Sequence, residues 1–405
     1  MLMQAKPQLD DFDWVFAEVI QHAHPIAKHE TLDLLCAKGR TLAQEMVSVI
    51  DLPRYPLSAM DGFALNIEDE NAFLKILTSQ FVGQPTVAEI TAGQCCKIMT
   101  GAVIPKGCNA VLPIEFAKLQ TRADGTYLLN PKGEISAGKN IKPIGTDLQC
   151  GQRLAAKGAR LNAKLMGLLA SAGIAQVAVL SQPKVALVTL GDELTDPKQA
   201  LPENAIYNAN WHLLESLLQN QAVDYVGHCC IPDDLVSLEK TLCALSKQAD
   251  LILTVGGSSQ GDKDFMPQVL QNAQYSRRYK LNMQPAKPLL HGKLNQAQIL
   301  ALPGNPIAAF LSYQLFAVPF LHKLCGLQPI PDFSTESGET VHLTQPIKAS
   351  QKLRWIPVIK NEDYVEPLQV MSSQLALLCQ ADGFIRVEPG RDYAVGASVR
   401  YWMEQ

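Results

Sequence analysis

Apolar residues recur at helical spacing at the start of the chain and in short alternating runs further on. Between Leu9 and Val49, spacings of three and four residues predict two amphipathic helices. From Pro53 to about Gly145, short β-rich runs alternate with Gly, Pro and Asp, which predicts a small sheet domain; the runs cover residues 75–78, 87–91, 110–114 and 127–129. A helix over residues 161–173 and a strand over residues 175–180 complete this half.

The pattern changes at Pro183, where continuous apolar runs begin to alternate with helical ones. Strands are expected at residues 184–190, 224–231, 251–255 and 299–302, and helices at residues 206–219, 234–249 and 307–324. This order predicts a parallel sheet with crossover helices. After Pro331, short alternating strands at residues 341–343, 353–359, 383–387 and 398–401 predict a small C-terminal β-barrel or β-sandwich.

Composition narrows the class of protein. A length of 405 residues suggests two to three domains. The net charge of -4 argues against nucleic acid as a partner. Ten cysteines without any C-x-x-C spacing, and no apparent secretory signal, predict a reduced, cytoplasmic protein. Polar residues and a proline interrupt the most apolar stretches, residues 165–180 and 307–324, so no membrane span is expected.

Three loops follow the predicted parallel strands and share one chemistry. They cover residues 190–194, 256–264 and 303–306, and they combine glycine with acidic residues. Glycine lets a phosphate approach the backbone, and a carboxylate beside it suits a divalent metal that also binds phosphate oxygens. Each loop alone is equally well explained by turns and helix caps. Three on one sheet edge favour a phosphate and metal site.

A second constellation lies outside this segment, at residues 58–64 (SAMDGFA) and 100–105 (TGAVIP). An Asp between small residues, such as Asp61, is most often a turn former. The eight histidines are scattered without metal-ligand spacing, so they are interpreted as surface or packing residues.

Six motifs in order resemble one family. They are PLSAMDGFA (56–64), MTGAVIPKGCNAVLPIE (99–115), TLGDEL (189–194), GGSSQGDKDF (256–265), MQPAKP (283–288) and ALPGNP (301–306). Together they are similar to the molybdopterin molybdenumtransferases, the family of bacterial MoeA and the gephyrin E domain.

The resemblance implies insertion of molybdate into adenylated molybdopterin with release of AMP, dependent on Mg²⁺. It implies a homodimer whose site is shared across the interface, with molybdopterin adenylyltransferase as the upstream supplier and no role for nucleic acid or membrane. The implied α/β multidomain fold is an elongated chain with four domains. These are a discontinuous N-terminal domain (1–50 and 145–180), a β-rich inserted domain (51–144), a parallel α/β molybdopterin-binding-like domain (181–327) and a C-terminal β-barrel-like domain (328–405).

The resemblance also assigns residues. It implies catalytic roles for Asp61, Thr100, Asp147, Glu193, Asp233 and Asp264, of which Asp61, Asp233 and Asp264 are the metal or phosphate carboxylates. Substrate contacts are implied for Ser58, Gly256, Gly257, Ser259, Gly261, Pro303, Gly304, Asn305 and Pro306, and for Lys287, which is assigned to the anion.

Several positions depart from the family pattern. Gln284 stands where Lys or Arg is usual, Ala286 where Gly is usual and Ala308 where Ser often follows, while Asn208 replaces a frequent Asp and Leu57 a frequent Asn. Loss of a cation from an oxyanion site costs a few kcal/mol of binding, on the order of a charged hydrogen bond. The alternative is therefore a catalytically weakened paralogue that acts as a pterin-binding or scaffold protein. A generic nucleotide-binding α/β protein is a third, weaker reading, because topology alone does not explain these motifs.

Overall fold

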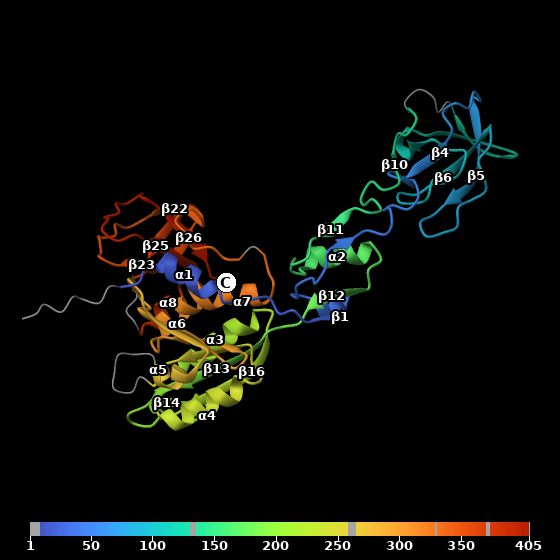
Figure 1. Ribbon diagram of the computed structural model, residues 1–405. Helices are drawn as coiled ribbons and strands as arrows, with labels where there is room; N and C mark the ends of the chain where they lie inside the picture. The colour runs from blue at the N-terminus through green and yellow to red at the C-terminus, as the bar shows by residue number, and fades with distance from the viewer. Residues whose placement is uncertain (1–8, 130–134, 258–264, 329, 370–372, 405) are drawn as a thin grey trace, which may run out of the picture. The chain divides into compact units, whose positions relative to one another are not determined.

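The computed structural model describes residues 9–129, 135–257, 265–328, 330–369 and 373–404. The chain forms two compact units, seen in Figure 1, which are treated separately here. Unit 1 comprises Met1–Gln44, Gly158–Asn162 and Gln176–Gln405, and unit 2 comprises Glu45–Lys157 and Ala163–Ala175. The finer division into four domains stays a prediction.

A six-stranded sheet forms the centre of unit 1. Its order is β16 (Asp224–Ile231), β13 (Lys184–Leu190), β17 (Leu251–Val255), β21 (Ala297–Leu302), β20 (Pro288–Leu294) and β18 (Tyr275–Lys280). The first four are the strands predicted from the sequence, and they are parallel, which confirms the prediction. Two further strands, which the sequence analysis did not predict, extend the sheet: β20 is antiparallel to β21, and β18 is antiparallel to β20. Only Asn295 and Gln296 separate β20 from β21, a connection that allows a hairpin and is far too short for a crossover helix.

Both faces of this sheet are buried. On β13, Val185 and Leu187 point into one core cluster, and Ala186 and Val188 point into the other. The first cluster is covered by α1 (Phe12–Ile20), α3 (Ala209–Gln219), α6 (Pro306–Ser312) and α7 (Val318–Leu324), and the second by α4 (Leu235–Leu245) and α5 (Met266–Val269). Alternate side chains of a strand thus fill two cores, which explains its continuous apolar run.

Helices α6 and α7 are joined through a π-helical turn at Tyr313–Ala317 into one segment, Pro306–Leu324. Its 19 residues are long and apolar enough to cross a membrane, but most of them are buried inside the unit. Burial against the sheet and α1 identifies the segment as a core helix.

The C-terminal strands of unit 1 close into a five-stranded barrel, which confirms the barrel prediction. Strands β23 (Leu353–Asn361), β24 (Tyr364–Pro367), β22 (Glu339–Leu343), β26 (Ser398–Met403) and β25 (Gly383–Val387) pair in this order, and β25 returns to β23. The short strand β19 (Met283–Gln284) is added in parallel to β23, which ties the MQPAKP segment to the barrel wall.

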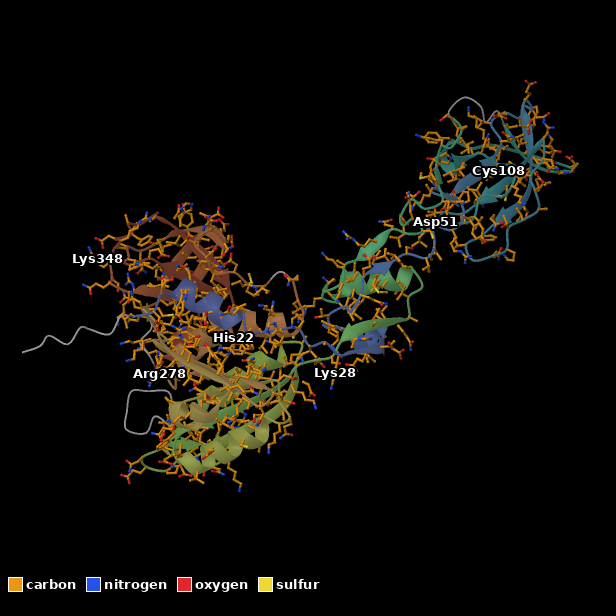
Figure 2. All side chains as sticks on the ribbon, viewed as in Figure 1. His22, Lys28, Asp51, Cys108, Arg278 and Lys348 are labelled. Atoms are coloured by element: carbon orange, nitrogen blue, oxygen red, sulfur yellow. The ribbon has the colours of Figure 1, made fainter. Side chains whose placement is uncertain are left out.

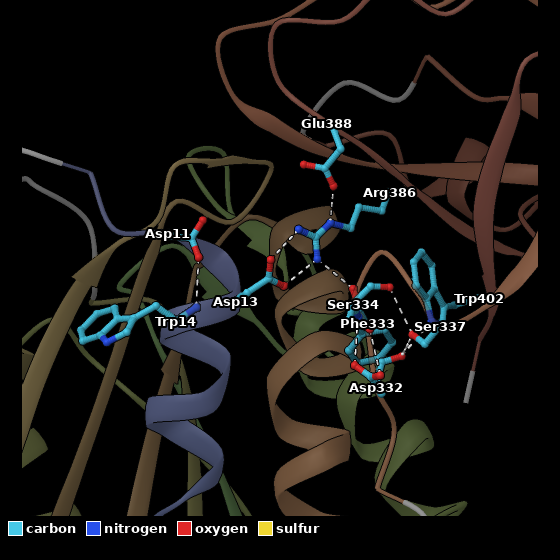
Figure 3. A network of polar contacts seen from close by, with 10 residues as sticks. All are labelled: Asp11, Asp13, Trp14, Asp332, Phe333, Ser334, Ser337, Arg386, Glu388 and Trp402. Carbon is cyan, nitrogen blue, oxygen red and sulfur yellow. Dashed lines mark hydrogen bonds and ion pairs between the residues drawn. The ribbon is translucent and has the colours of Figure 1, made fainter.

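A buried arginine joins the barrel to the first helix (Figure 3). The Arg386 guanidinium donates to both carboxylate oxygens of Asp13, at 2.6 and 2.7 Å, and to Glu388 Oε1 at 2.7 Å. It also donates to the carbonyl of Phe333 at 2.9 Å. Because a buried cation is tolerated only when paired and hydrogen-bonded, these contacts fix the position of α1 on the barrel.

The prediction of a second N-terminal helix is wrong. The chain instead forms β1 (His29–Asp33), a 3₁₀ turn at Leu34–Ala37 and β2 (Met46–Val47). Strand β1 pairs along its length with β12 (Gln176–Leu180), a partner far away in sequence that periodicity does not reveal. Leu35, counted as part of the apolar face, is 86% exposed.

Unit 2 contains a second six-stranded sheet, of order β7 (Ala110–Pro113), β4 (Gly62–Leu65), β6 (Gln94–Ile98), β5 (Phe73–Gln80), β9 (Gly125–Leu129) and β8 (Lys118–Arg122). The prediction of a strand at residues 87–91 is wrong. That stretch is irregular, and the pairing of β6 with β5 begins at Gln94. Helix α2 (Ala163–Ser171) lies within the helix predicted at residues 161–173.

Candidate functional site

A cavity of about 430 Å³ opens at the carboxyl ends of β13, β17 and β21 in unit 1. All three predicted loops reach it. Eight predicted site residues line it: Glu193, Asp233, Gly256, Gly257, Pro303, Gly304, Asn305 and Pro306. This cavity, called the strand-end pocket below, lies where ligands bind in open α/β sheets.

Two glycines allow the loops of this pocket to approach each other. Gly256 has φ +92°, and a Cβ there would lie 2.6 Å from the carbonyl oxygen of Leu190. Gly304 lies against the backbone of Gly256, where a Cβ would be 3.4 Å from its Cα. Packing between neighbouring strand ends therefore requires glycine at position 256, whereas a Cβ at position 304 would make an ordinary contact.

The PGNP loop starts the core helix. Asn305 is its N-cap, and its Oδ1 accepts from the backbone N–H groups of Ile307 at 3.2 Å and Ala308 at 3.5 Å. Pro306 occupies the first turn, where its missing N–H costs nothing. The conformation of this loop is thus explained by helix capping, which leaves the Asn305 side-chain oxygen already occupied.

Two carboxylates face the pocket. Glu193 is exposed on the loop after β13, and Asp233 lies after β16 with its backbone N–H bonded to Asp192 Oδ1 at 3.1 Å. Within the described ranges, no group of three or more His, Cys, Asp or Glu residues has the arrangement of a metal site. Three predicted site residues lie outside the described residues: Ser259, Gly261 and Asp264, the last of which is one of the three carboxylates assigned to metal or phosphate.

The pocket also contains polar residues that the sequence analysis did not select. Asn208, noted only as a departure, is the N-cap of α3, and its Oδ1 accepts from the Trp211 backbone N–H at 3.2 Å. This cap fixes the amide orientation, so Nδ2 faces Thr189 and donates to Oγ1 at 2.7 Å. Thr189 Oγ1 lies 2.8 Å from His228 Nε2. A chain of hydrogen bonds therefore leads from the pocket wall to strand β16.

The direction of this chain follows from the donors. Thr189 is fully buried, and its oxygen accepts from Asn208. A hydroxyl can also donate one bond, and we assign this hydrogen to His228 Nε2, which is then the unprotonated nitrogen. Burial lowers the pKa of His228 to about 4, although Glu215 opposes the shift. His228 is thus neutral at pH 7, stacked on Trp211 at a centroid distance of 4.2 Å.

A second cavity in unit 1, of about 700 Å³, lies between the MQPAKP segment and the barrel. Gln284 and Pro285 line it from one side, and Lys348, Arg354 and Trp355 from the other; Lys348 is labelled in Figure 2. Gln284 is paired in register with Arg354 through strands β19 and β23. The charge missing at position 284 therefore has two cationic neighbours that the sequence did not indicate.

Lys287 lies between the two cavities along the chain, because Pro285 lines the larger cavity and Pro288 lines the strand-end pocket. Its side chain is exposed. Next to it, Ala286 has φ +70°, a left-handed conformation that favours glycine. This conformation explains why glycine is usual in the family at this position.

In unit 2, three predicted residues come together. The backbone N–H and the hydroxyl of Thr100 both donate to Asp61 Oδ1, at 2.7 and 2.8 Å. These two bonds, first the backbone and then the side-chain one, lower the pKa of the exposed Asp61. Ser58 is buried below them, where its hydroxyl donates to the Met60 carbonyl at 2.6 Å.

The backbone at this corner is tightly packed. A Cβ on Gly62 would lie 2.0 Å from the Leu112 carbonyl oxygen, so glycine after Asp61 lets β4 and β7 come together. Asp147 lies on a separate turn, where its N–H donates to the Leu52 carbonyl at 2.8 Å. Among the described contacts, none joins Asp147 to Asp61 or Thr100.

Comparisons with known proteins agree with this arrangement. Three family models match in chain order: the MoeA N-terminal region (domain I and II) at residues 12–173, a probable molybdopterin binding domain at residues 186–323, and the MoeA C-terminal region (domain IV) at residues 340–403. The strand-end pocket lies within the second match.

Two curated relatives that are more than 30% identical are named molybdopterin molybdenumtransferase. The molybdopterin molybdenumtransferase of Haemophilus influenzae is 34% identical over 299 residues, which cover 73% of each chain. That of Nostoc is 31% identical, over 74% of this chain and 70% of its own.

Among solved structures, a molybdopterin biosynthesis MoeA protein from Pyrococcus horikoshii superposes with a TM-score of 0.81, at 24% identity, over 98% of this chain and 100% of the other. This similarity confirms the fold. With the three models and the relatives, it leads to one conclusion: the chain belongs to the molybdopterin molybdenumtransferase family.

Proposed function

We propose that the protein inserts molybdate into adenylated molybdopterin and releases AMP, as a step of molybdenum cofactor synthesis. The observation that carries the proposal is the strand-end pocket, which gathers eight predicted site residues inside the segment matched by a molybdopterin binding model. The names of the relatives support the same reaction.

In this proposal the two cavities bind different substrates. The strand-end pocket, with Glu193 and Asp233, accommodates part of the adenylated pterin. Lys348 and Arg354 line the larger cavity and supply positive charge for a small dianion such as molybdate. Lys287, on the segment between the cavities, also binds the anion in this proposal.

A divalent cation fits the donor set. Mg²⁺ prefers oxygen ligands and is commonly held by one or two carboxylates together with substrate phosphates. Glu193 and Asp233 would hold it from the pocket wall, with Asp264 and Asp61 as the other carboxylates that the family resemblance implies. Bound there, the ion would offset negative charge on the departing AMP.

We also propose a cytoplasmic homodimer that receives its substrate from a molybdopterin adenylyltransferase. All ten cysteines are free thiols, which agrees with a reducing compartment. Exposed apolar side chains beside Asp61, such as Met60 and Ile114, suit an interface that brings this corner to a partner subunit's pocket. Nucleic acid and membrane play no part in the proposal.

The test is AMP release from adenylated molybdopterin in the presence of molybdate and Mg²⁺. We expect AMP to appear only when both protein and molybdate are present. If adenylated molybdopterin binds but no AMP forms, the pterin-binding or scaffold alternative replaces the enzyme. Gln284→Lys then shows whether the missing cation is the cause, because it restores the usual charge beside Arg354.

A further inference from the structure

We propose that a cavity on the barrel, called the arginine pocket below, binds a phosphate group. The cavity has a volume of about 300 Å³, and its lining shares no residue with the strand-end pocket or with the larger cavity. It is lined by three arginines, Arg386, Arg391 and Arg400, together with the hydroxyl residues Thr340 and Ser398. This site lies outside the proposed function and does not depend on it.

The strand order brings two of these arginines into one row on the outside of the barrel. Arg400 on β26 is paired with Thr340 on β22 and with Arg386 on β25. The neighbouring residues Val341 and Val399 fill the barrel core, and successive side chains of a strand alternate between its faces, so the row points outward. Like charges directly opposite each other on neighbouring strands are destabilising. Negative charge beside the row would therefore stabilise it.

Carboxylates of the protein reach only one of these two arginines (Figure 3). Arg386 donates to both oxygens of Asp13 and to Glu388 Oε1. Arg400 donates instead to uncharged oxygens of residues 335–340, through Nε and Nη1 at 2.6 to 3.4 Å. Among the described residues, Arg400 has no ion pair, and its Nη2 has no hydrogen-bond partner. Its guanidinium is thus held in place with one amino group free for an anion.

Arg391 is a second cation without an ion pair among the described residues. Its side chain is exposed, and its guanidinium lies 4.8 Å from the centroid of the Tyr393 ring. Tyr393 is itself fixed, because it is buried and its hydroxyl accepts from the Glu388 backbone N–H at 3.2 Å. Stacking on this ring restricts Arg391 and leaves its N–H groups free. Thr340 adds a donor, since its oxygen accepts from Arg400 and its own hydrogen stays available.

These donors suit a phosphate group better than a carboxylate. They come from β22, β26 and the segment 388–393, so they approach one bound group from several directions. A carboxylate presents its oxygens in one plane, which matches one guanidinium, whereas a phosphate group presents about three acceptor oxygens around one centre. Its charge of about -2 at neutral pH also matches the charges of Arg391 and Arg400. Glu388, the carboxylate of the described lining, is already bound by Arg386.

The experiment measures, on the full chain, how phosphate slows the modification of Arg391 by phenylglyoxal, which reacts with accessible guanidinium groups. Peptide mass spectrometry reports the rate at each arginine separately, so binding to another cavity is not confused with binding here. Arg54 is the internal control, because it is also exposed and its guanidinium lies 6.0 Å from the centroid of the Tyr55 ring. At constant ionic strength, we expect about 10 mM inorganic phosphate to slow Arg391 at least about tenfold and Arg54 less than about twofold.

Two further ligands identify the chemistry that the pocket accepts. Methyl phosphate is a phosphate monoester, and acetate is a carboxylate. Protection of Arg391 by inorganic phosphate alone indicates a site for the free ion, and protection by both phosphates indicates a site that also accepts monoesters; either result supports the proposal. Acetate at the same concentration should slow the modification less than about twofold.

Variants assign the protection to this pocket. Arg400→Gln keeps a polar side chain and removes the charge, so the protection of Arg391 by phosphate should fall to less than about twofold. Thr340→Val keeps the side-chain shape and removes one donor, so the phosphate concentration needed should rise about threefold. Arg354→Gln removes a cation from the larger cavity and is the matched control, which should leave the protection intact. Urea unfolding confirms that each variant is folded.

An unchanged rate at Arg391 in the wild type with phosphate overturns the proposal without any variant. Equal slowing of Arg391 and Arg54 overturns it as well, because it reports a general ionic effect. Protection by acetate as strong as that by phosphate contradicts a phosphate site, and protection that survives in folded Arg400→Gln excludes this pocket. None of these outcomes depends on AMP release, so the phosphate site and the proposed function fail separately.

Discussion

The two units bury different chemistry. All eight histidines and all four tryptophans belong to unit 1, and unit 2 contains neither. Unit 1 buries His291 and several polar side-chain atoms, such as Asn210 Oδ1, that have no hydrogen-bond partner among the described residues. Unit 2 buries the thiols Cys95 and Cys96, whose pKa values burial raises to about 12 and about 11.

The principal carboxylate of unit 2 has the opposite character. Asp61 is exposed, yet two hydrogen bonds from Thr100 already hold it. Unit 1 thus buries polar atoms without a described partner, and unit 2 presents an exposed charge that is already hydrogen-bonded. Under the proposed function, we expect the strand-end pocket of unit 1 to provide most of the binding and Asp61 of unit 2 to contribute to turnover.

Asp61→Ala should separate these two contributions most strongly. We expect AMP release to fall at least about a hundredfold, because a pre-positioned charge acts on the transition state. The affinity of unit 1 for AMP should change by no more than about twofold, because the substitution removes no contact in the strand-end pocket. Asp124→Ala is the control. Asp124 is another exposed carboxylate of unit 2, and a hydrogen bond from Tyr127 lowers its pKa. Equal losses in both variants would contradict the distinction.

Gly256→Ala should damage unit 1 alone. The added Cβ meets the Leu190 carbonyl oxygen in a backbone that already has positive φ, which should destabilise the unit by about 2–4 kcal/mol. Urea unfolding followed by tryptophan fluorescence reports on unit 1, because it holds every tryptophan.

The matched control for Gly256→Ala is Gly227→Ala. Gly227 has φ +134° on the same sheet, but a Cβ there meets nothing within 4 Å. It should cost only the conformational strain, about 1 kcal/mol. If both variants lose the same stability, close packing of the strand ends is not the reason for glycine at position 256.

Much of unit 1 was predictable from the sequence, for identifiable reasons. Strands such as β13 are buried on both faces, so an unbroken apolar run marked them, and glycine marked the ends of β13 and β17. The hairpin strand β18 was missed because YSRRYK has no apolar run. The helix predicted after residue 32 failed because β1 takes its stability from β12, almost 150 residues later in the chain.

The site shows the same limit. Loop glycines, carboxylates and the residues of the PGNP motif could be selected from the sequence, and eight of them line one pocket. Asn208 and His228 could not, since what distinguishes them is a buried hydrogen-bond chain through Thr189. Such a chain joins residues from three separate segments, which the sequence pattern does not bring together.

Acid should destabilise unit 1 through His291. Burial lowers the pKa of His291 to about 4, although its bond to Gln298 opposes the shift, and the His22 ring lies beside it. The unfolded chain therefore takes up this proton first, near pH 6.5, and stability falls as the pH drops from 6.5 towards 4. The loss is up to about 3 kcal/mol.

His291→Gln, which does not titrate, should reduce this dependence in fluorescence-monitored unfolding between pH 4 and 6.5, and the part that remains comes from His228, whose pKa burial also lowers to about 4. Unit 2 contains no histidine and should show no such loss over the same range. His342→Gln, at a half-buried position of the barrel, is the control for the exchange of histidine for glutamine itself. An unchanged slope in His291→Gln would show that protonation of other groups governs the acid limb.

Asn208→Asp should have the smallest effect on activity and a distinct spectroscopic one. An aspartate would accept from the Thr189 hydroxyl, so Thr189 Oγ1 would accept in turn from His228 Nε2–H, and the hydrogen-bond chain would reverse. The added charge should raise the pKa of His228 from about 4, since an opposite charge favours the protonated ring. Histidine ¹⁵N shifts report the tautomer directly.

Thr189→Val cuts the hydrogen-bond chain and serves as the control, because it removes both contacts while keeping the side-chain shape. AMP release should change only about threefold, on the scale of one neutral hydrogen bond. An unaltered Nδ1–H tautomer in Asn208→Asp would show that His228 is set by its stacking on Trp211 and not by the pocket wall.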